Sequence, residues 1–315
     1  MRELHAPAES TLHRSLAGFC ATHSDLVLAG DHFQFIRRRD LVAGKPSLIS
    51  GGGFGFEPMH IGFVGQGMLD AACPGPLFAA PSPGQVLAAA QAVETGGGVL
   101  LIVPNFAADV INFEAGGAMA HGDVETVIVD DGVAPARFIE PGQSRCIGGI
   151  AIVEKIVGAA AERGMALADL AALGHRVNAR TRSMGMALGD AGNLSSADGT
   201  FVEEAVAQTA AMVLANLAAA RSAPCLLLVN GFGGTPLMAL YQCCHLARLG
   251  LQAEGIVIAR SLVGSYGASR AMAGFSLTLC ALDAQMHELW VAPVATAVWR
   301  WGHVAKIIPP VSGNP

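Results

Sequence analysis

The sequence predicts an α/β protein with two α/β domains, in which helices flank the sheets. Two features of the chain lead to this fold class. Short apolar runs such as Val99-Leu-Leu-Ile-Val103 and Cys225-Leu-Leu-Leu-Val229 are continuous rather than alternating, as in strands that are buried on both faces. These runs alternate with longer, alanine-rich stretches of helical character, and that order is typical of a parallel sheet with right-handed crossovers.

Each element is expected from one of these two patterns. Continuous apolar runs predict strands, and alanine-rich stretches predict helices, because alanine has the strongest helix propensity. The expected strands are residues 46–50, 98–103, 125–129, 225–230, 255–260 and 276–282. The expected helices are residues 10–22, 83–93, 107–121, 147–163, 166–187, 200–220, 236–250 and 284–291.

A domain boundary is predicted at residues 188–199, the longest polar and glycine-containing stretch between two predicted helices. The first α/β unit, residues 1–187, is expected to carry a pocket formed by a glycine loop. Residues 188–315 are expected to form the second unit. A chain of 315 residues is long enough to bury two such cores.

The composition limits the kinds of partner that the protein is expected to bind. Charged residues make up only 14% of the chain and hydrophobic residues 52%, so we expect a second copy to cover apolar surface in a homodimer. The formal net charge of −6 argues against binding to nucleic acid or to an anionic membrane. We find no leader peptide, no run of about 20 apolar residues and no metal-ligand spacing among the seven cysteines. A cytoplasmic protein with reduced thiols and no metal site is therefore expected.

Three loops that follow predicted strands are the candidate ligand-binding segments. They are residues 50–60, 104–113 and 230–236. Because open α/β sheets bind ligands at the carboxyl ends of their strands, together these loops favour a small polar ligand held by backbone N–H groups. None of them has the phosphate-binding Gly-Lys-Ser/Thr or the glycine spacing of a dinucleotide site, so no cofactor is expected to bind directly.

Three side chains in these loops are candidates for proton transfer. Asp109 lies in the first turn of a predicted helix, where it can be a catalytic carboxylate or a helix cap. Glu57 precedes Pro58 and can complement a helix dipole or act in catalysis. His60 can be a catalytic base or a structural histidine.

The loops also carry a family resemblance. Ser50-Gly-Gly-Gly-Phe-Gly-Phe-Glu-Pro58, Asn105-Phe-Ala-Ala-Asp-Val-Ile-Asn-Phe113 and Asn230-Gly-Phe-Gly-Gly-Thr-Pro-Leu-Met238 resemble motifs of the dihydroxyacetone kinase substrate-binding subunits, the Dak1-type domain. The resemblance continues in order from about residue 10 to Trp301. It implies two α/β domains, a homodimer, and a short-chain ketose bound in the first domain. It also implies that the phosphoryl group comes from ATP or a phosphoprotein through a separate, helical nucleotide-binding subunit.

Some family residues carry over to this chain. Gly52 and Gly53 match the substrate-contacting loop, and Asp109 matches the catalytic carboxylate that acts on the substrate hydroxyl. Asn105 and Phe106 lie in a matched motif and are expected to contact the substrate.

Other positions depart from the family. Phe54 and Phe56 stand where the family has a serine and a histidine, and Pro104 replaces a basic residue. The Gly-x-His-Gly-Glu-Pro-Gly segment that holds the ketose covalently has no counterpart, since no histidine occurs between His175 and His245. The expected pocket therefore keeps Asp109, gains an apolar wall from Phe54, Phe56 and Phe106, and holds a larger or less polar ligand reversibly.

Three functions are compatible with these residues. The first is a divergent kinase substrate subunit for a small hydroxylated carbonyl or sugar-like metabolite, with Asp109 as the base. The second is a non-kinase enzyme, an isomerase or hydrolase, in which Asp109, Glu57 or His60 moves protons. The third is a catalytically silent regulatory protein that binds a metabolite.

Overall fold

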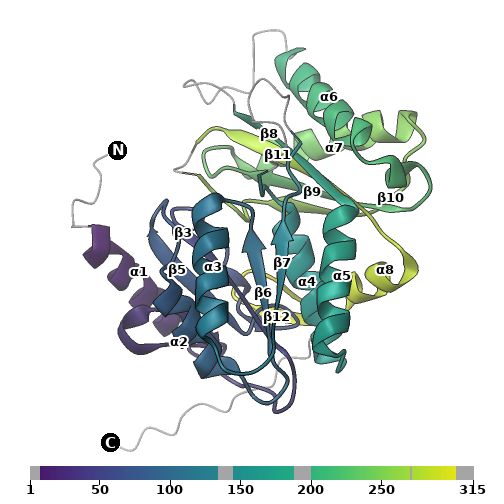
Figure 1. Ribbon diagram of the computed structural model, residues 1–315. Helices are drawn as coiled ribbons and strands as arrows, with labels where there is room; N and C mark the ends of the chain where they lie inside the picture. The colour runs from purple at the N-terminus through teal and green to yellow at the C-terminus, as the bar shows by residue number, and fades with distance from the viewer. Residues whose placement is uncertain (1–7, 134–144, 188–199, 270–271, 303–315) are drawn as a thin grey trace, which may run out of the picture.

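The computed structural model describes residues 8–133, 145–187, 200–269 and 272–302, which form two main sheets flanked by helices (Figure 1). The first sheet has the order β1 (Val27–Ala29), β2 (Ile36–Arg38), β5 (Ala71–Leu77), β3 (Ser47–Phe54), β6 (Val99–Pro104), β7 (Val124–Val129). The second has the order β10 (Ile258–Gly264), β9 (Cys225–Gly231), β11 (Gly274–Ala281), β8 (Thr181–Ala187). A small third sheet has the order β13 (Arg300–Trp301), β12 (Val294–Thr296), β4 (Gly65–Gln66).

The helices cover the faces of these sheets and confirm the predicted α/β class. The α-helices are α1 (Ala8–Thr22), α2 (Pro83–Val93), α3 (Ala107–Met119), α4 (Gly149–Glu162), α5 (Leu167–Ala179), α6 (Thr200–Ala215), α7 (Leu237–Ala253) and α8 (Ala284–Val291). Short 3-10 turns are η1 (Asp31–Phe33), η2 (Ile61–Phe63) and η3 (Ala218–Arg221).

The first sheet is parallel at its centre. Strand β3 pairs in parallel with both β5 and β6, and β6 pairs in parallel with β7. All six residues of β6 are buried, which explains its continuous apolar sequence. In the second sheet β9 pairs in parallel with β10 and antiparallel with β11. The carboxyl ends of β3, β6 and β9 carry the three loops singled out from the sequence.

Helix α4 is the element around which both sheets pack. It contacts β3, β6 and β7 of the first sheet and β8 and β11 of the second. Residues from Gly149 to Ala161 are all buried, including the charged side chains of Glu154 and Lys155. Asp131 stabilises the start of this helix, because its carboxylate accepts hydrogen bonds from the N–H groups of Ile147, Gly148 and Gly149 at 3.0, 3.1 and 2.7 Å.

Two predicted elements need correction. The helix expected over 166–187 ends at Ala179, and the strand β8 follows, because Thr181 and Ser183 are buried in pairing with β11. The strand expected at 255–260 lies at Ile258–Gly264 instead. Gly255 has φ +78° and closes the turn after α7, so the chain cannot yet be extended there.

Seven strands were not predicted. Strand β5 has the sequence Ala-Ala-Cys-Pro-Gly-Pro-Leu, in which two prolines and a glycine hide any strand pattern. The others are short, except β8, which was assigned to a helix. They are β1, β2, β4, β5, β8, β12 and β13.

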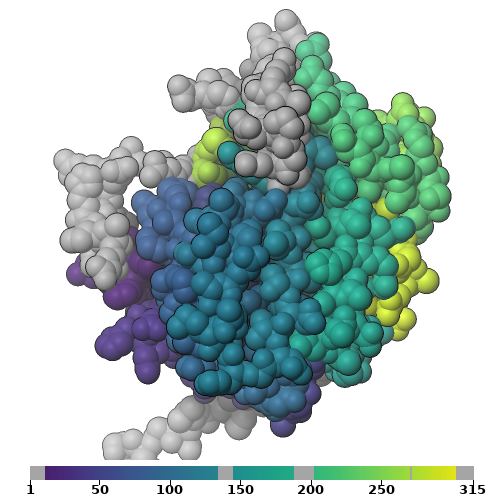
Figure 2. Space-filling view, in the orientation of Figure 1, coloured from purple at the N-terminus to yellow at the C-terminus, as the bar shows by residue number. Residues whose placement is uncertain are grey.

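Strand β8 already belongs to the second sheet, although it precedes the predicted boundary. The boundary segment 188–199 lies outside the described residues. After the second sheet the chain returns to the first half, where β12 pairs with β4 and α8 packs against α4. In Figure 2 the yellow α8 lies beside the teal α5, and Arg176 of α5 pairs with Asp283 at 3.4 Å. The division into 1–187 and 188–315 stays a prediction.

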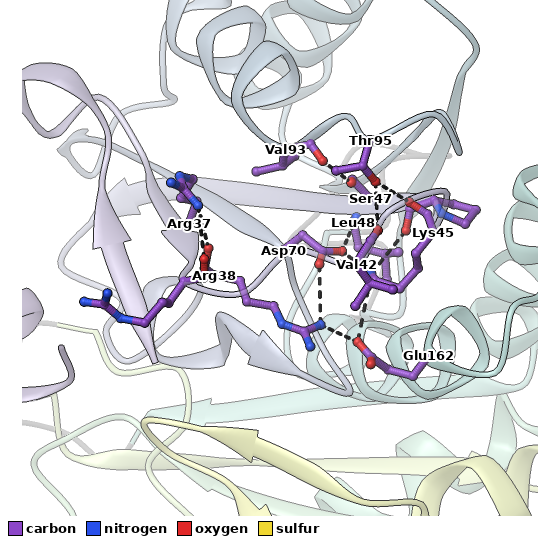
Figure 3. Close-up of polar contacts among 12 residues, drawn as sticks. Arg37, Arg38, Val42, Lys45, Ser47, Leu48, Asp70, Val93, Thr95 and Glu162 are labelled. Atoms are coloured by element: carbon purple, nitrogen blue, oxygen red, sulfur yellow. Dashed lines mark hydrogen bonds and ion pairs between the residues drawn. The ribbon is translucent and has the colours of Figure 1, made fainter. Parts of the chain in front are cut away.

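A buried ion network anchors the first sheet to α4 (Figure 3). Asp70 accepts hydrogen bonds from Lys45 Nζ at 2.6 Å and from the backbone N–H of Leu48 at 2.9 Å. Arg38 lies 3.7 Å from the other Asp70 oxygen and also pairs with Glu162 of α4. Because Asp70 is 1% exposed, its charge is compensated by these partners rather than by water.

We predict that Asp70→Ala lowers the free energy of unfolding by about 3–5 kcal/mol, because it removes the carboxylate that compensates buried Lys45 and leaves Arg38 with Glu162 alone. Glu288→Ala, which removes a solvent-exposed pair with Arg163, should cost less than about 1 kcal/mol. Urea unfolding of both variants measures the difference. Equal losses in the two variants would contradict the role given to the buried network.

Candidate functional site

A cavity of about 280 Å³ lies where the carboxyl ends of the two sheets meet. Its wall comes from the glycine loop, the end of β6 with the start of α3, the segment before α4, and the second sheet. The structure thus brings together all three predicted loops. The lining residues are Gly52, Gly53, Phe56, Met59, His60, Pro104, Phe106, Asp109, Cys146, Ile147, Gly185, Asn230, Phe232, Gly267, Ala268, Ser269 and Met272.

The glycine loop is shaped by close backbone approach. A Cβ atom on Gly53 would lie 2.7 Å from the backbone nitrogen of Ala79, so only glycine fits where β3 passes this segment. A Cβ atom on Gly52 would lie 3.6 Å from His60 Nε2, which places the imidazole directly over the loop. The predicted substrate-binding residues Gly52 and Gly53 therefore form one wall of the cavity together with a titratable ring.

Asp109 faces the cavity from the first turn of α3 and is only 7% exposed. Burial raises the pKa of its carboxyl from 3.8 to about 6, against the opposing attraction of His60 and a backbone hydrogen bond. Its Oδ1 is buried and has no hydrogen-bond partner among the described residues. A carboxyl group with these properties can exchange a proton with a bound hydroxyl near neutral pH.

His60 is held at the cavity wall by two buried side chains. Its Nδ1 lies 2.6 Å from Oε1 of Glu154 and 3.1 Å from the Ser50 hydroxyl. The three residues come from α4, from β3 and from the loop that follows β3. The imidazole therefore has a fixed orientation, as a proton-transfer group requires.

Glu57, the third predicted proton-transfer residue, is directed back onto its own loop. Both of its carboxylate oxygens accept a hydrogen bond from the backbone N–H of Gly55, at 2.9 and 3.0 Å. Burial raises the pKa of this carboxyl, although the hydrogen bond from Gly55 opposes that shift. Glu57 is not among the residues that line the main cavity, so its geometry is that of a loop-closing residue.

The predicted substrate-contacting aromatic and amide residues separate into two groups. Phe56 and Phe106 line the cavity, and Phe56 packs edge-to-face on Phe78 at 5.1 Å between ring centroids. Phe54 and Asn105 are not among the cavity-lining residues. Phe54 borders a hollow of about 10 Å³, and the backbone N–H of Asn105 donates to the Val129 carbonyl in the neighbouring strand β7.

Two residues that shape the site were not predicted from the sequence. Asn230 was identified only as part of a loop; its side chain binds the backbone of Tyr266 and Gly267 at 2.7–3.0 Å and fixes the opposite wall. Glu154 lies in the apolar stretch Gly149-Ile-Ala-Ile-Val-Glu-Lys-Ile-Val157, where a charged residue on a buried helix was the available signal.

The described residues contain no group of three or more potential metal ligands of the His, Cys, Asp or Glu type. Among the helices in the described part of the chain, none is long and apolar enough to cross a membrane.

Comparison with known proteins defines the family of this fold. The Dak1 domain matches residues 17–201 and 189–298. The PEP-dependent dihydroxyacetone kinase, dihydroxyacetone-binding subunit DhaK of Escherichia coli is 33% identical over 96% of this chain and all of its own length. The chain belongs to the Dak1 family.

Two solved structures have the same fold. The dihydroxyacetone kinase operon co-activator DhaQ aligns with a TM-score of 0.84 and 26% identity, over 92% of this chain and 99% of its own. The dihydroxyacetone kinase of C. freundii in complex with AMP-PNP and Mg²⁺ aligns with a TM-score of 0.84 and 26% identity. That alignment covers 99% of this chain and 64% of the kinase.

We predict that Asp109→Asn stabilises the protein at pH 7.5 and not at pH 4. These two pH values lie above and below the raised pKa of about 6. The folded state holds this proton more tightly than the unfolded chain. The free energy of unfolding of the wild type therefore falls as the pH rises from 3.8 through about 6. The Asp109→Asn variant has no carboxyl group at this position, so it does not show this decrease. The gain at high pH should be about 1–3 kcal/mol.

Denaturant unfolding of the wild type and of Asp109→Asn across this pH range measures the effect. Asn112→Ala, which removes a hydrogen bond on the same helix and no charge, is the matched control and should give a pH-independent change. A difference between wild type and Asp109→Asn that stays constant with pH would contradict the burial of an ionisable carboxyl.

Proposed function

We propose that this protein is a substrate-binding subunit of the dihydroxyacetone kinase type. It binds a small hydroxylated carbonyl or sugar-like metabolite in the cavity between the sheets. The buried carboxyl oxygen of Asp109, which has no hydrogen-bond partner among the described residues, carries this proposal, because it is the group that would accept the hydrogen bond and then the proton of a ligand hydroxyl. The resemblance to kinase substrate subunits supports the same role for Asp109.

Binding is proposed to be reversible. The chain has no histidine between residues 175 and 245, so the residue that would form a covalent adduct in the family motif is missing. Phe56, Phe106, Phe232, Met59 and Met272 give the cavity an apolar wall instead. Among the described residues, His60, Asp109 and the thiol of Cys146 are its titratable groups, and no described lysine or arginine lines it. An uncharged ligand with an apolar part suits this lining better than a phosphorylated or carboxylate compound.

The phosphoryl group is proposed to come from a separate partner. The described residues that line the cavity include no phosphate-binding glycine motif, and the family resemblance supports a donor, ATP or a phosphoprotein, that acts through a helical nucleotide-binding subunit. A homodimer in the cytoplasm is part of the same proposal. Exposed apolar side chains on the first turns of α7, Leu237, Met238 and Tyr241, are suitable for covering by another chain.

A regulatory role is the second candidate function. The structural similarity to the operon co-activator DhaQ favours it. That protein has the same fold, aligns over 99% of its own length, and is named as a co-activator of an operon. In this case the cavity would bind a metabolite without phosphoryl transfer, and Asp109 would contribute to affinity rather than to turnover.

We predict that short ketoses and hydroxyketones with an added alkyl group raise the melting temperature, and that their carboxylate counterparts do not. A ligand at about 100 times its Kd contributes about 2.7 kcal/mol to the folded state. Thermal-shift measurements with matched neutral and anionic compounds test this prediction. Stabilisation by the anionic series alone would refute the proposed ligand class.

Incubation with dihydroxyacetone should leave the mass of the protein unchanged, because no histidine is available at the family position to form a hemiaminal. An adduct of dihydroxyacetone detected by mass spectrometry of the intact protein would contradict reversible binding.

Phosphoryl transfer separates the two candidate functions. With a stabilising ligand and a reconstituted donor subunit, Asp109→Asn should lower turnover by about 10²-fold or more, the usual effect of losing a general base. Transfer that is undiminished in this variant would remove Asp109 from the mechanism. Stabilisation by ligand without any transfer would favour the regulatory function.

A further inference from the structure

Glu154 is a buried carboxylate that none of the family-like motifs contains. It lies in the middle of α4 and is fully buried. The residues around it on this helix are almost entirely apolar, so a charged side chain is unexpected there. A charge in such a place is costly unless a partner compensates it. Its Oε1 lies 2.6 Å from Nδ1 of His60, and its Oε2 has no hydrogen-bond partner in the part of the chain that the structure describes.

The contact determines which nitrogen of His60 carries a proton. A carboxylate, unlike a carboxylic acid, can only accept hydrogen bonds, so a carboxylate at Glu154 makes Nδ1 the donor. The remaining nitrogen, Nε2, then has a free lone pair when the ring is neutral. Nε2 is the ring atom that lies over Gly52 at the cavity wall.

The groups around the ring agree with this arrangement. Ser50 of β3 reaches the same nitrogen at 3.1 Å, and its hydroxyl can accept as well as donate. Asp109 of α3 lines the same cavity as His60, and Cys146, which precedes α4, lies near Glu154. These are the titratable and polar groups that face the pair from the neighbouring elements. Burial raises the pKa of the Cys146 thiol well above its ordinary value, so the thiol is neutral.

We propose that Glu154 is a positioning residue that fixes His60 as the Nδ1–H tautomer and thereby makes Nε2 a hydrogen-bond acceptor inside the cavity. A ligand hydroxyl would donate to Nε2 while Asp109, in the same cavity, is available for a second hydroxyl. This inference deepens the proposed function and rests on it for the identity of the ligand, but the tautomer itself is a property of the ligand-free chain.

The tautomer can be measured by NMR on the full chain labelled with ¹⁵N-histidine. Long-range ¹H–¹⁵N correlations distinguish a protonated from an unprotonated ring nitrogen, and His60→Gln identifies the His60 signals. At about pH 8, where an ordinary histidine is neutral, we expect the proton on Nδ1 of His60. A proton on Nε2 in the wild type would overturn the proposal without any variant.

Two variants each remove one partner of Nδ1. Glu154→Leu replaces the carboxylate with an apolar side chain of similar size, which buried sites often tolerate. The Ser50 hydroxyl can then donate to Nδ1, and we expect the proton to move to Nε2. Ser50→Ala is the matched control and should leave the proton on Nδ1. An unchanged tautomer in Glu154→Leu, or a changed one in Ser50→Ala, would contradict the role of Glu154. Neither result depends on which ligand, if any, the cavity binds.

Discussion

The burial of α4 between the two sheets is the constraint on which the rest of the structure depends. One helix contacts β3, β6 and β7 on one side and β8 and β11 on the other. Its start is held by Asp131, and its far end is tied to the first sheet through Glu162 and Arg38. Because this helix is fixed at both ends, the two sheets meet with their carboxyl ends around the cavity, and Glu154 is held against His60 in the cavity wall.

Desolvation gives the cavity its chemistry. Burial raises the pKa of the Asp109 carboxyl to about 6, and its Oδ1, which has no hydrogen-bond partner among the described residues, faces a largely apolar lining. His60 is oriented by a carboxylate that is itself buried. Two proton-exchanging groups thus lie in a site whose described lining is otherwise largely apolar, with Cys146, Asn230 and Ser269 as further polar residues. Such a lining suits an uncharged ligand that contributes hydroxyl groups of its own.

The central strands and the helices could be predicted because their apolar patterns are strong. Strand β5 could not, since Pro74 and Pro76 mask it, and β8 could not, since its pairing with β11 overrides a helix-like sequence. The glycine loop and Asp109 were found from their place after strands. Glu154 was not found, because its function depends on a contact 94 residues away in the chain. The residues next to Glu154 in the sequence do not indicate its contact with His60.

The titration of Asp109 tests the central claim most directly. ¹³C NMR of the aspartate carboxyl carbons, with Asp109→Asn to assign the signal, gives the midpoint in the ligand-free protein. A buried carboxyl kept available for a ligand predicts a midpoint at about 6. A midpoint at the ordinary value of 3.8 would show that water solvates this group, and it would contradict the site described here.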